Sequence, residues 1–313
     1  MDGILNINKP QGLTSFDIVA RVKRITGERH TGHAGTLDPL ATGVLPICLG
    51  KATRVIEYLF NETKTYRAEI KLGVATDSYD STGKVIKTAD SSNVTRENLE
   101  AVLAAFRGSI MQTPPMFSAV KRQGVPLYKL ARSGIEVERK SRPAQIDKLI
   151  IINWQSPFFS VEVVCGKGTY IRSLAQDIGQ ALGCGAVMNN LVRTRVGPFG
   201  LDEAITLEQL EQMVGSGYSD RYLYPPDYAL QSFDAMVVNH EQQCLLAHGS
   251  PIILEANSSE IKPGAFGRVY NQEGVFVGMV EYDAANQRWQ PHKVFLQSCC
   301  QQQASEQPQT EYS

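Results

Sequence analysis

The chain has 313 residues, a length that suits two domains, because single hydrophobic cores stop growing at roughly 250–300 residues. Its 42% hydrophobic and 20% charged residues are typical of a globular protein and exclude wholesale disorder and a fibrous class. The net charge of -1 conceals an asymmetry: residues 1–200 carry 26 basic and 17 acidic side chains, whereas residues 201–313 carry 5 and 15. This imbalance indicates contact of the basic part with nucleic acid or a membrane surface.

The composition also bears on the cellular compartment. No apolar run approaches the roughly 20 residues that a membrane span needs, and the N-terminus lacks the apolar stretch of a secretory signal. The six cysteines include no C-x-x-C pair, which favours reduced thiols and argues against zinc. We therefore expect a cytoplasmic protein.

The first fifty residues predict a strand, a helix and a loop. Alternation over residues 3–8, ended by Lys9-Pro10, predicts a short strand. The motif Thr14-x-x-Asp17 resembles a capping box before apolar residues at helical spacing, and Gly27 closes this predicted helix. Residues 30–50 break both periods, and their glycines and two prolines predict an ordered loop.

Strand and helix patterns follow along the rest of the chain. We expect strands over 64–72, 146–154 and 160–165, helices over 95–106 and 169–182, and another helix that starts at the capping box Thr206-x-x-Gln209. From about residue 234, short strand-like runs alternate with turns and predict a small β-rich module. The polar, Gln-rich residues 298–313 are predicted to be disordered.

The densest motif is GHAGTLDPLATG, residues 32–43, where Asp38 lies in a glycine-rich loop. Alone, Asp38-Pro39 indicates only a turn. Backbone amides of such a loop could also bind an anion, but the pattern is neither G-x-x-x-x-G-K-[ST] nor G-x-G-x-x-G, which gives nucleotide binding little support. His30 and His33 have no third ligand nearby in sequence, so zinc is not indicated either.

The stretch GHAGTLDPLATGVLPICLG, preceded by Lys9-Pro10, closely resembles the tRNA pseudouridine synthases of the TruB family. Matching motifs continue in family order over most of residues 3–200: KTY (64–66), GxxTDxxD (73–80), QxPPxFSA (112–119), GIE (134–136), RP (142–143) and KGTYIR (167–172). The resemblance implies an α+β fold, in which helices flank a mixed, largely antiparallel sheet and a small PUA-like β-barrel follows. The implied domains are a catalytic domain (1–232), an RNA-binding domain (233–297) and a disordered tail (298–313).

The resemblance also implies a reaction. Enzymes of this family detach uracil from its ribose and rejoin it through carbon 5, without a metal or cofactor. The implied substrate is the uridine at position 55 in the T loop of tRNA, flipped out of its stack. Asp38 would be the nucleophile, and whether it attacks the ribose or the uracil ring stays open. Arg172 would pair with Asp38 and hold it ionised and oriented.

Further residues are assigned to the substrate by the same resemblance. Tyr66 would stack against the flipped uracil, Tyr170 would line the same pocket, and Leu191 would contact the base. His33 would hold the rearranged RNA after the base has left its stack. Lys9 is also expected to belong to the substrate site.

Without the resemblance, the same residues have simpler interpretations. Tyr66 would be a strand aromatic packed in a core. Arg172 would be a solvated residue in the first turn of a helix, although a cation at that helix end hints at an anionic partner. Asp77 and Asp80, set in TDSYDSTG, favour a turn with side-chain caps over a metal site.

Residues 116–145 carry seven basic side chains and two acidic ones. Such a run could simply be a solvated face. The resemblance instead implies an RNA-gripping segment that closes over the T arm, with Lys121, Arg122 and Lys129 on phosphates. The acidic C-terminal module departs from this pattern. It could contact RNA through few basic residues, or act mainly as a spacer; the candidates are Lys262, Arg268 and Lys293.

We expect tRNA to be the binding partner. The protein is expected to be a monomer that acts without a guide RNA, a metal or a membrane. Two alternatives belong to other classes: a non-catalytic RNA-binding protein on the same scaffold, and a nucleotide-binding enzyme. Within the family, the alternative is a guide-RNA-dependent synthase. The simultaneous presence of Asp38, Tyr66 and Arg172 favours catalysis, because a protein that only binds RNA has no need of all three.

Overall fold

A computed structural model of the chain describes residues 1–118, 120–217, 222–254 and 261–296. The chain divides into two compact units, Met1–Tyr224 and Pro225–Ser313. No helix among the described residues is long and apolar enough to cross a membrane. The tail predicted to be disordered, 298–313, lies outside the described residues.

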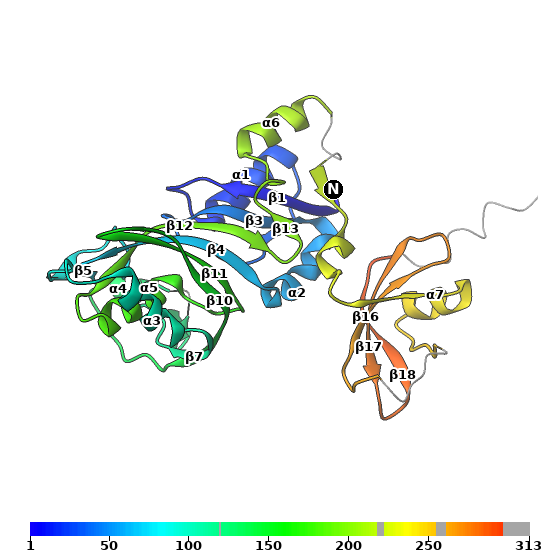
Figure 1. Cartoon of the computed structure of the whole chain (residues 1–313). Helices are drawn as coiled ribbons and strands as arrows, with labels where there is room; N and C mark the ends of the chain where they lie inside the picture. Colours follow the sequence, from blue (N-terminus) through cyan, green and yellow to red (C-terminus); the bar gives the residue numbers. More distant parts are fainter. Residues whose placement is uncertain (119, 218–221, 255–260, 297–313) are drawn as a thin grey trace, which may run out of the picture. The chain divides into compact units, whose positions relative to one another are not determined.

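A ten-stranded sheet forms the centre of the first unit (Figure 1). Its strands are β1 (Gly3–Lys9), β2 (Thr31–His33), β3 (Thr42–Leu49), β4 (Lys64–Leu72), β7 (Gly108–Gln112), β10 (Arg142–Gln155), β11 (Phe158–Cys165), β12 (Ala186–Val196), β13 (Phe199–Gly200) and β14 (Leu223–Tyr224). The order is β14-β1-β3-β12-β4-β11-β10-β7, with β13 beside β12 and β2 beside β3. Strands β12 and β3 run parallel, and the other ladders are antiparallel. The predicted mixed, largely antiparallel sheet is confirmed.

Helices and small ladders surround this sheet. They are α1 (Ser15–Thr26), the 3-10 helix η1 (Gly50–Val55), α2 (Ile56–Asn61), α3 (Arg96–Ala104), α4 (Leu127–Arg132), α5 (Ile171–Ala181), α6 (Leu207–Gly215), and the paired strands β5 (Val74–Thr76) with β6 (Val85–Thr88) and β8 (Lys121–Arg122) with β9 (Val125–Pro126). One apolar cluster joins α1 and α6 to β1 and β3, and a second joins α3 and α5 to β4, β10, β11 and β12. The sheet therefore carries two cores.

The ends of α1 follow the predicted pattern. Thr14 and Asp17 form a reciprocal capping box, because the Asp17 amide donates to the Thr14 hydroxyl and the Thr14 amide donates to the Asp17 carboxylate. At the other end, Gly27 adopts a left-handed conformation with φ 70°, which glycine tolerates without strain. Helix α1 is thereby fixed directly before the glycine-rich loop.

Only the middle of the expected loop over residues 30–50 is a loop. Strand β2 occupies Thr31–His33 and strand β3 occupies Thr42–Leu49, where every residue from Gly43 to Leu49 is buried. A strand buried on both faces shows a continuous apolar run instead of alternation, so the period of a half-buried strand is missing. Pro46 argued further against a strand. In the structure it pairs with Asn6 of β1, and its carbonyl accepts a hydrogen bond from the Ala34 amide at 3.0 Å.

The described part of the second unit contains a four-stranded sheet, one α-helix and one 3-10 helix. Its elements are the 3-10 helix η3 (Pro226–Leu230), β15 (Asp234–Val237), α7 (His240–Ala247), β16 (Phe266–Tyr270), β17 (Phe276–Asp283) and β18 (Arg288–Val294). The order β15-β16-β17-β18 is an open path, with β15 parallel to β16. Among the described residues β18 does not pair back with β15, so the expected closed barrel is not confirmed.

Candidate active site

The loop that carries Asp38 connects β2 to β3 and is anchored on both sides of the carboxylate. The Leu37 amide donates to the hydroxyl of Ser15 at 2.8 Å, and this hydroxyl also contacts the Leu37 carbonyl at 3.2 Å. The Pro39 carbonyl accepts from the Gly12 amide at 2.8 Å. Because Ser15 is the first residue of α1, the start of that helix fixes the position of Asp38.

Lys9 supports the same loop from inside the protein. Its side chain is fully buried, and its ammonium group donates to the carbonyls of Ala41 at 2.6 Å, Pro10 at 3.0 Å and Pro39 at 3.5 Å. Burial lowers the pKa of Lys9 to about 8, although the charge of Asp38 opposes this shift. The structure thus places Lys9 beneath the loop and away from the surface, and its expected contact with the substrate stays a prediction.

Arg172 forms a bidentate ion pair with Asp38. The Arg172 Nε lies 2.9 Å from Asp38 Oδ2, and a terminal nitrogen of the same guanidinium donates to Asp38 Oδ1 at 3.0 Å. The side chain of Arg172 is 6% exposed, whereas that of Asp38 is 35% exposed. Two parallel bonds fix both the distance and the plane of the carboxylate. The Arg172 side chain is therefore buried, whereas the Asp38 side chain remains accessible to a substrate.

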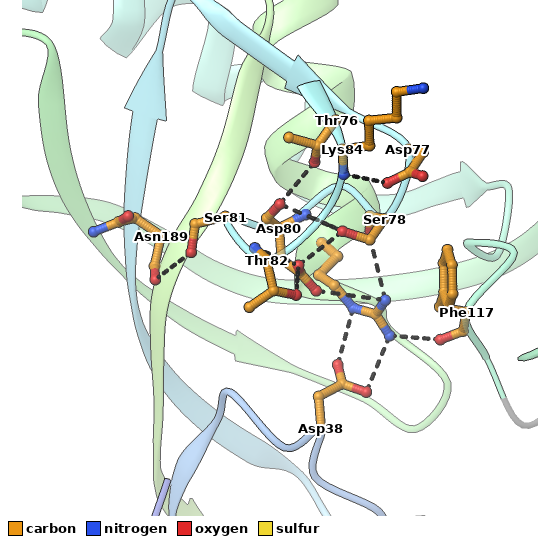
Figure 2. A network of polar contacts seen from close by, with 11 residues as sticks. Asp38, Thr76, Asp77, Ser78, Asp80, Ser81, Thr82, Lys84, Phe117 and Asn189 are labelled. Atoms are coloured by element: carbon orange, nitrogen blue, oxygen red, sulfur yellow. Dashed lines mark hydrogen bonds and ion pairs between the residues drawn. The ribbon is translucent and has the colours of Figure 1, made fainter. Parts of the chain in front are cut away.

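Further groups surround the Arg172 guanidinium (Figure 2). It donates to the carbonyls of Phe117 at 2.8 Å and Ser78 at 3.3 Å, and it lies 3.8 Å from Asp80 Oδ2. A cation in the first turn of α5 is disfavoured by the helix dipole, and these acceptors offset that cost. Five interactions from three segments hold the guanidinium in place.

The ionisation of Asp38 depends on Arg172. Burial raises the pKa of the Asp38 carboxyl above its ordinary value; the Arg172 guanidinium opposes this rise, and the charge of Asp80 adds to it. Without Arg172 this rise in the pKa of Asp38 would lack its main opposing charge, and a larger fraction of Asp38 would be protonated. The pair therefore orients the carboxylate and favours its charged form.

Asp80 has a role that sequence reasoning missed. Asp77 and Asp80 cap a turn as predicted, because Asp77 accepts from the Lys84 amide at 2.9 Å and Asp80 Oδ1 accepts from the Thr82 amide at 3.0 Å. Asp80 Oδ2, however, faces Arg172, which makes Asp80 a second carboxylate beside the guanidinium (Figure 2). The GxxTDxxD motif was the available signal, although its local pattern indicates only the turn.

Tyr66 and Tyr170 come from different elements. Tyr66 is a half-buried residue of β4, and Tyr170 is the N-cap of α5. The side-chain amide of Gln112 holds the Tyr170 backbone, since it accepts from the Tyr170 amide at 3.0 Å and donates to its carbonyl at 3.3 Å. Burial raises the pKa of both phenols, and the charge of Asp38 adds to the rise in each. Both tyrosines therefore lie within the electrostatic reach of Asp38.

Leu191 and His33 lie on strands next to these groups. Leu191 of β12 is buried opposite Ala68 of β4, and it belongs to the same apolar cluster as Leu37 and Tyr66. His33 ends β2, and its buried Nδ1 has no hydrogen-bond partner among the described residues. Burial lowers the pKa of His33, which favours the neutral imidazole.

The basic segment 116–145 connects directly to the ion pair, because its residue Phe117 supplies a carbonyl to Arg172. Further along, Arg122 and Lys129 are exposed, and Arg122 donates to the Glu138 carbonyl at 2.9 Å. Lys121 lies in β8, but its side chain is outside the described part of the structure. The segment thus offers exposed cations close in sequence to a carbonyl of the site.

No group of three or more His, Cys, Asp or Glu side chains that could hold a metal ion is present within the described ranges. The polar groups of the site are two carboxylates, a guanidinium and two phenols, contributed by Asp38, Asp80, Arg172, Tyr66 and Tyr170. Such a set can supply a nucleophile or base, fix its charge, and offer aromatic faces to a planar ligand.

Comparison with known proteins gives two family matches. A model described as the TruB family pseudouridylate synthase N-terminal domain matches residues 23–171, and one described as the tRNA pseudouridylate synthase B C-terminal domain matches residues 172–231. A relative from Dehalococcoides mccartyi, named tRNA pseudouridine synthase B, is 47% identical over 95% of this chain and 97% of its own. A relative of the same name from Clostridium acetobutylicum is 45% identical over 89% and 95%.

Two solved structures with a similar fold are complexes of several components. A crystal structure of a Cbf5-Nop10-Gar1 complex matches with a TM-score of 0.73 and 27% identity, covering 94% of this chain and 85% of the other. The structure of an H/ACA RNP bound to a substrate RNA matches with a TM-score of 0.72, 25% identity and the same coverage.

Proposed function

Because this chain belongs to the TruB family of pseudouridylate synthases, we propose that it converts uridine to pseudouridine in tRNA, at position 55 of the T loop, with Asp38 as the nucleophile. The relatives named tRNA pseudouridine synthase B match over nearly the whole chain, which supports the tRNA substrate. The bidentate Asp38–Arg172 pair carries the proposal for the nucleophile.

The exposure of this pair fits a nucleophile. The Arg172 side chain is almost completely buried, while about a third of the Asp38 side chain is open to an incoming ribose or base. Arg172 opposes the upward pKa shift that burial imposes on Asp38, so it favours the anionic form that can attack. A carboxylate can both form and release an adduct, and the reaction needs both steps.

The proposed reaction balances without an oxidant or reductant. Asp38 attacks either the ribose or the uracil ring, and the bond between uracil N1 and the ribose carbon breaks. The ring turns, uracil C5 forms a bond to the same ribose carbon, the proton on C5 leaves to a base, and the freed N1 takes up a proton. Release of Asp38 regenerates the enzyme, and the product is an isomer of the substrate.

The target base has to leave its stack to reach Asp38. RNA loops have bases that can be splayed out and stacked on aromatic side chains, which suits a T-loop uridine. Tyr66 and Tyr170 would lie against the flipped uracil, and Leu191 would contact it from β12. His33, whose buried Nδ1 has no hydrogen-bond partner among the described residues, would hold the rearranged RNA after the base has moved.

Affinity for tRNA would come from the basic segment 116–145. Its exposed Arg122 and Lys129, together with Lys121, would contact phosphates of the T arm, and such contacts weaken as salt rises. We further infer a catalytic domain over 1–232 and an RNA-binding domain over 233–297 with the PUA-like architecture. In that second domain the candidates for RNA contact are Lys262, Arg268 and Lys293.

The proposed enzyme acts alone, as a monomer and without a guide RNA. The similar solved structures come from complexes with other proteins, but their identity to this chain is 25–27%, whereas the relatives named tRNA pseudouridine synthase B reach 47%. A cytoplasmic location fits a substrate of this kind.

An assay with purified protein and an unmodified tRNA transcript tests the proposal. Pseudouridine is mapped by chemical modification and primer extension after incubation with the wild type or with Asp38→Asn. We expect modification at position 55 with the wild type, and no product but retained tRNA binding with Asp38→Asn. Product at another position would contradict the T-loop assignment, and undiminished product from Asp38→Asn would contradict the nucleophile.

A further inference from the structure

Arg193 is a buried cation to which the proposed function assigns no role. Its side chain, on β12, is 1% exposed. Its Nε donates to the Val44 carbonyl at 2.7 Å, and a terminal nitrogen donates to the Gly35 carbonyl at 3.0 Å. No acidic side chain forms an ion pair with it among the residues that the structure describes. A guanidinium without a carboxylate is costly to bury, so its presence calls for a physical reason.

Along the chain, one of the two carbonyls precedes Asp38 and the other follows it. Gly35 precedes the carboxylate by three residues, and Val44 follows it in β3, so one side chain ties together both arms of the loop. The backbones also meet: Gly43 pairs with Arg193 in the parallel ladder, adopts φ +99°, and has no room for a Cβ against the Arg193 carbonyl. Glycine is required there by both its conformation and this close approach.

Tyr66 lies beside Arg193 across the sheet. The two residues are direct partners in the antiparallel ladder between β12 and β4, so their side chains stand next to each other on one face of the sheet. Burial raises the pKa of Tyr66, and the charge of Arg193 opposes that rise. Arginine can only donate hydrogen bonds, so the Tyr66 oxygen would be the acceptor of a bond from Arg193.

We propose that Arg193 is a positioning residue for the isomerisation, which holds the Tyr66 hydroxyl and the Asp38 loop in one fixed relation so that both face the flipped uracil. This inference rests on the proposed function of the site. Arg193 itself is too deeply buried to touch the RNA. Its contribution therefore belongs to the rate of the chemical step and not to the affinity for tRNA.

Two substitutions separate the geometry of Arg193 from its charge. Arg193→Lys retains a positive charge but cannot reach the Gly35 carbonyl, the Val44 carbonyl and Tyr66 at once, because an ammonium lacks the planar fork of a guanidinium. Arg193→Met removes the charge and retains an unbranched side chain. We expect single-turnover rates to fall about 10- to 100-fold in Arg193→Lys and further in Arg193→Met, with tRNA affinity changed by less than about twofold.

Arg195→Met is the matched control. This arginine lies two residues further on the same strand, but it is exposed, and its guanidinium contacts only the Pro198 carbonyl among the described residues, at 3.4 Å. Its replacement removes the same charge from the same strand without changing the contacts of Tyr66. We expect a wild-type single-turnover rate at saturating enzyme.

A double-mutant cycle between Arg193→Lys and Tyr66→Phe tests whether the two residues act together. If Arg193 acts through the Tyr66 hydroxyl, its replacement slows the Tyr66→Phe enzyme far less than it slows the wild type. The proposal would be overturned if the rate reduction in the double variant equalled the product of the two single rate reductions to within about twofold. A wild-type rate for Arg193→Lys would overturn it as well.

Urea unfolding of the same four proteins provides a second measurement if Tyr66→Phe has no detectable rate. The contact predicts non-additive changes in the free energy of unfolding, and additive changes would overturn it. The wild-type reaction separates the two hypotheses. Absence of pseudouridine from the wild type refutes the proposed function, whereas an active wild type with an additive cycle refutes only the role of Arg193.

Discussion

Replacement of Asp80 by Asn should slow the reaction without weakening tRNA binding. Asp80→Asn keeps a side-chain oxygen that can accept from Thr82, but it removes the charge and can place an amide donor opposite the Arg172 guanidinium. At the observed 3.8 Å and an effective dielectric constant of about 20, the attraction between the two charges is about 4 kcal/mol before desolvation. Arg172 retains both bonds to Asp38, so we expect only a part of this energy to be lost, about 1–3 kcal/mol, or about a 5- to 150-fold slower step.

Asp77→Asn is the matched control for this substitution. Asp77 caps the same turn through the Lys84 amide but does not contact Arg172 (Figure 2). Single-turnover formation of pseudouridine is measured with excess enzyme, and tRNA affinity is measured by filter binding. We predict a lower single-turnover rate for Asp80→Asn and a nearly wild-type rate for Asp77→Asn, with equal affinities of both variants for tRNA. Equal rates for the two variants would refute the idea that Asp80 acts through Arg172 and not merely through the turn.

Three further predictions concern the loop and the basic segment. Gly43→Ala should lower the free energy of unfolding by more than Gly108→Ala, because both glycines have positive φ but only Gly43 lacks room for a Cβ; equal losses in urea unfolding would contradict this. Replacing Arg122 and Lys129 by Ala should weaken tRNA binding and reduce its salt slope by about 1–2, and an unchanged slope would exclude phosphate contact. Between pH 8 and 10.5 the unfolded chain holds a proton on Lys9 that the folded chain has lost, so Lys9 contributes a rise in unfolding free energy with pH. Lys9→Met should show a smaller rise than the wild type over this window, and an equal rise would contradict the lowered pKa.

The structure brings together groups whose proximity no local pattern encodes. Asp38 and Arg172 are far apart in the chain, and only the family motifs suggested that they meet; the structure has them at 2.9 Å. Asp80 shows the opposite case. Its turn was predictable from the side-chain caps, but its contact with Arg172 depends on how the turn after β5 approaches the start of α5. Tertiary geometry of this kind has no signature at the level of neighbouring residues.

Burial explains the other differences. Lys9 was expected to belong to the substrate site, but β1 runs beside β3 and places its ammonium group under the loop carbonyls. Strand β3 is buried on both faces and therefore lacks alternation. Helix α7 was not predicted, because Leu246 is its one buried residue and no apolar stripe marks it. Patterns that report one buried face are least informative where a segment is wholly buried or has only a single buried residue.

Release of tritium from tRNA labelled at carbon 5 of uridine tests the role of Asp38 most directly, because the isomerisation has to remove the hydrogen at that carbon. The wild type and Asp38→Asn are compared under single-turnover conditions, after filter binding has shown that both bind the tRNA. The proposed mechanism predicts release by the wild type, and none by Asp38→Asn at equal occupancy. Release by Asp38→Asn at the wild-type rate would contradict it.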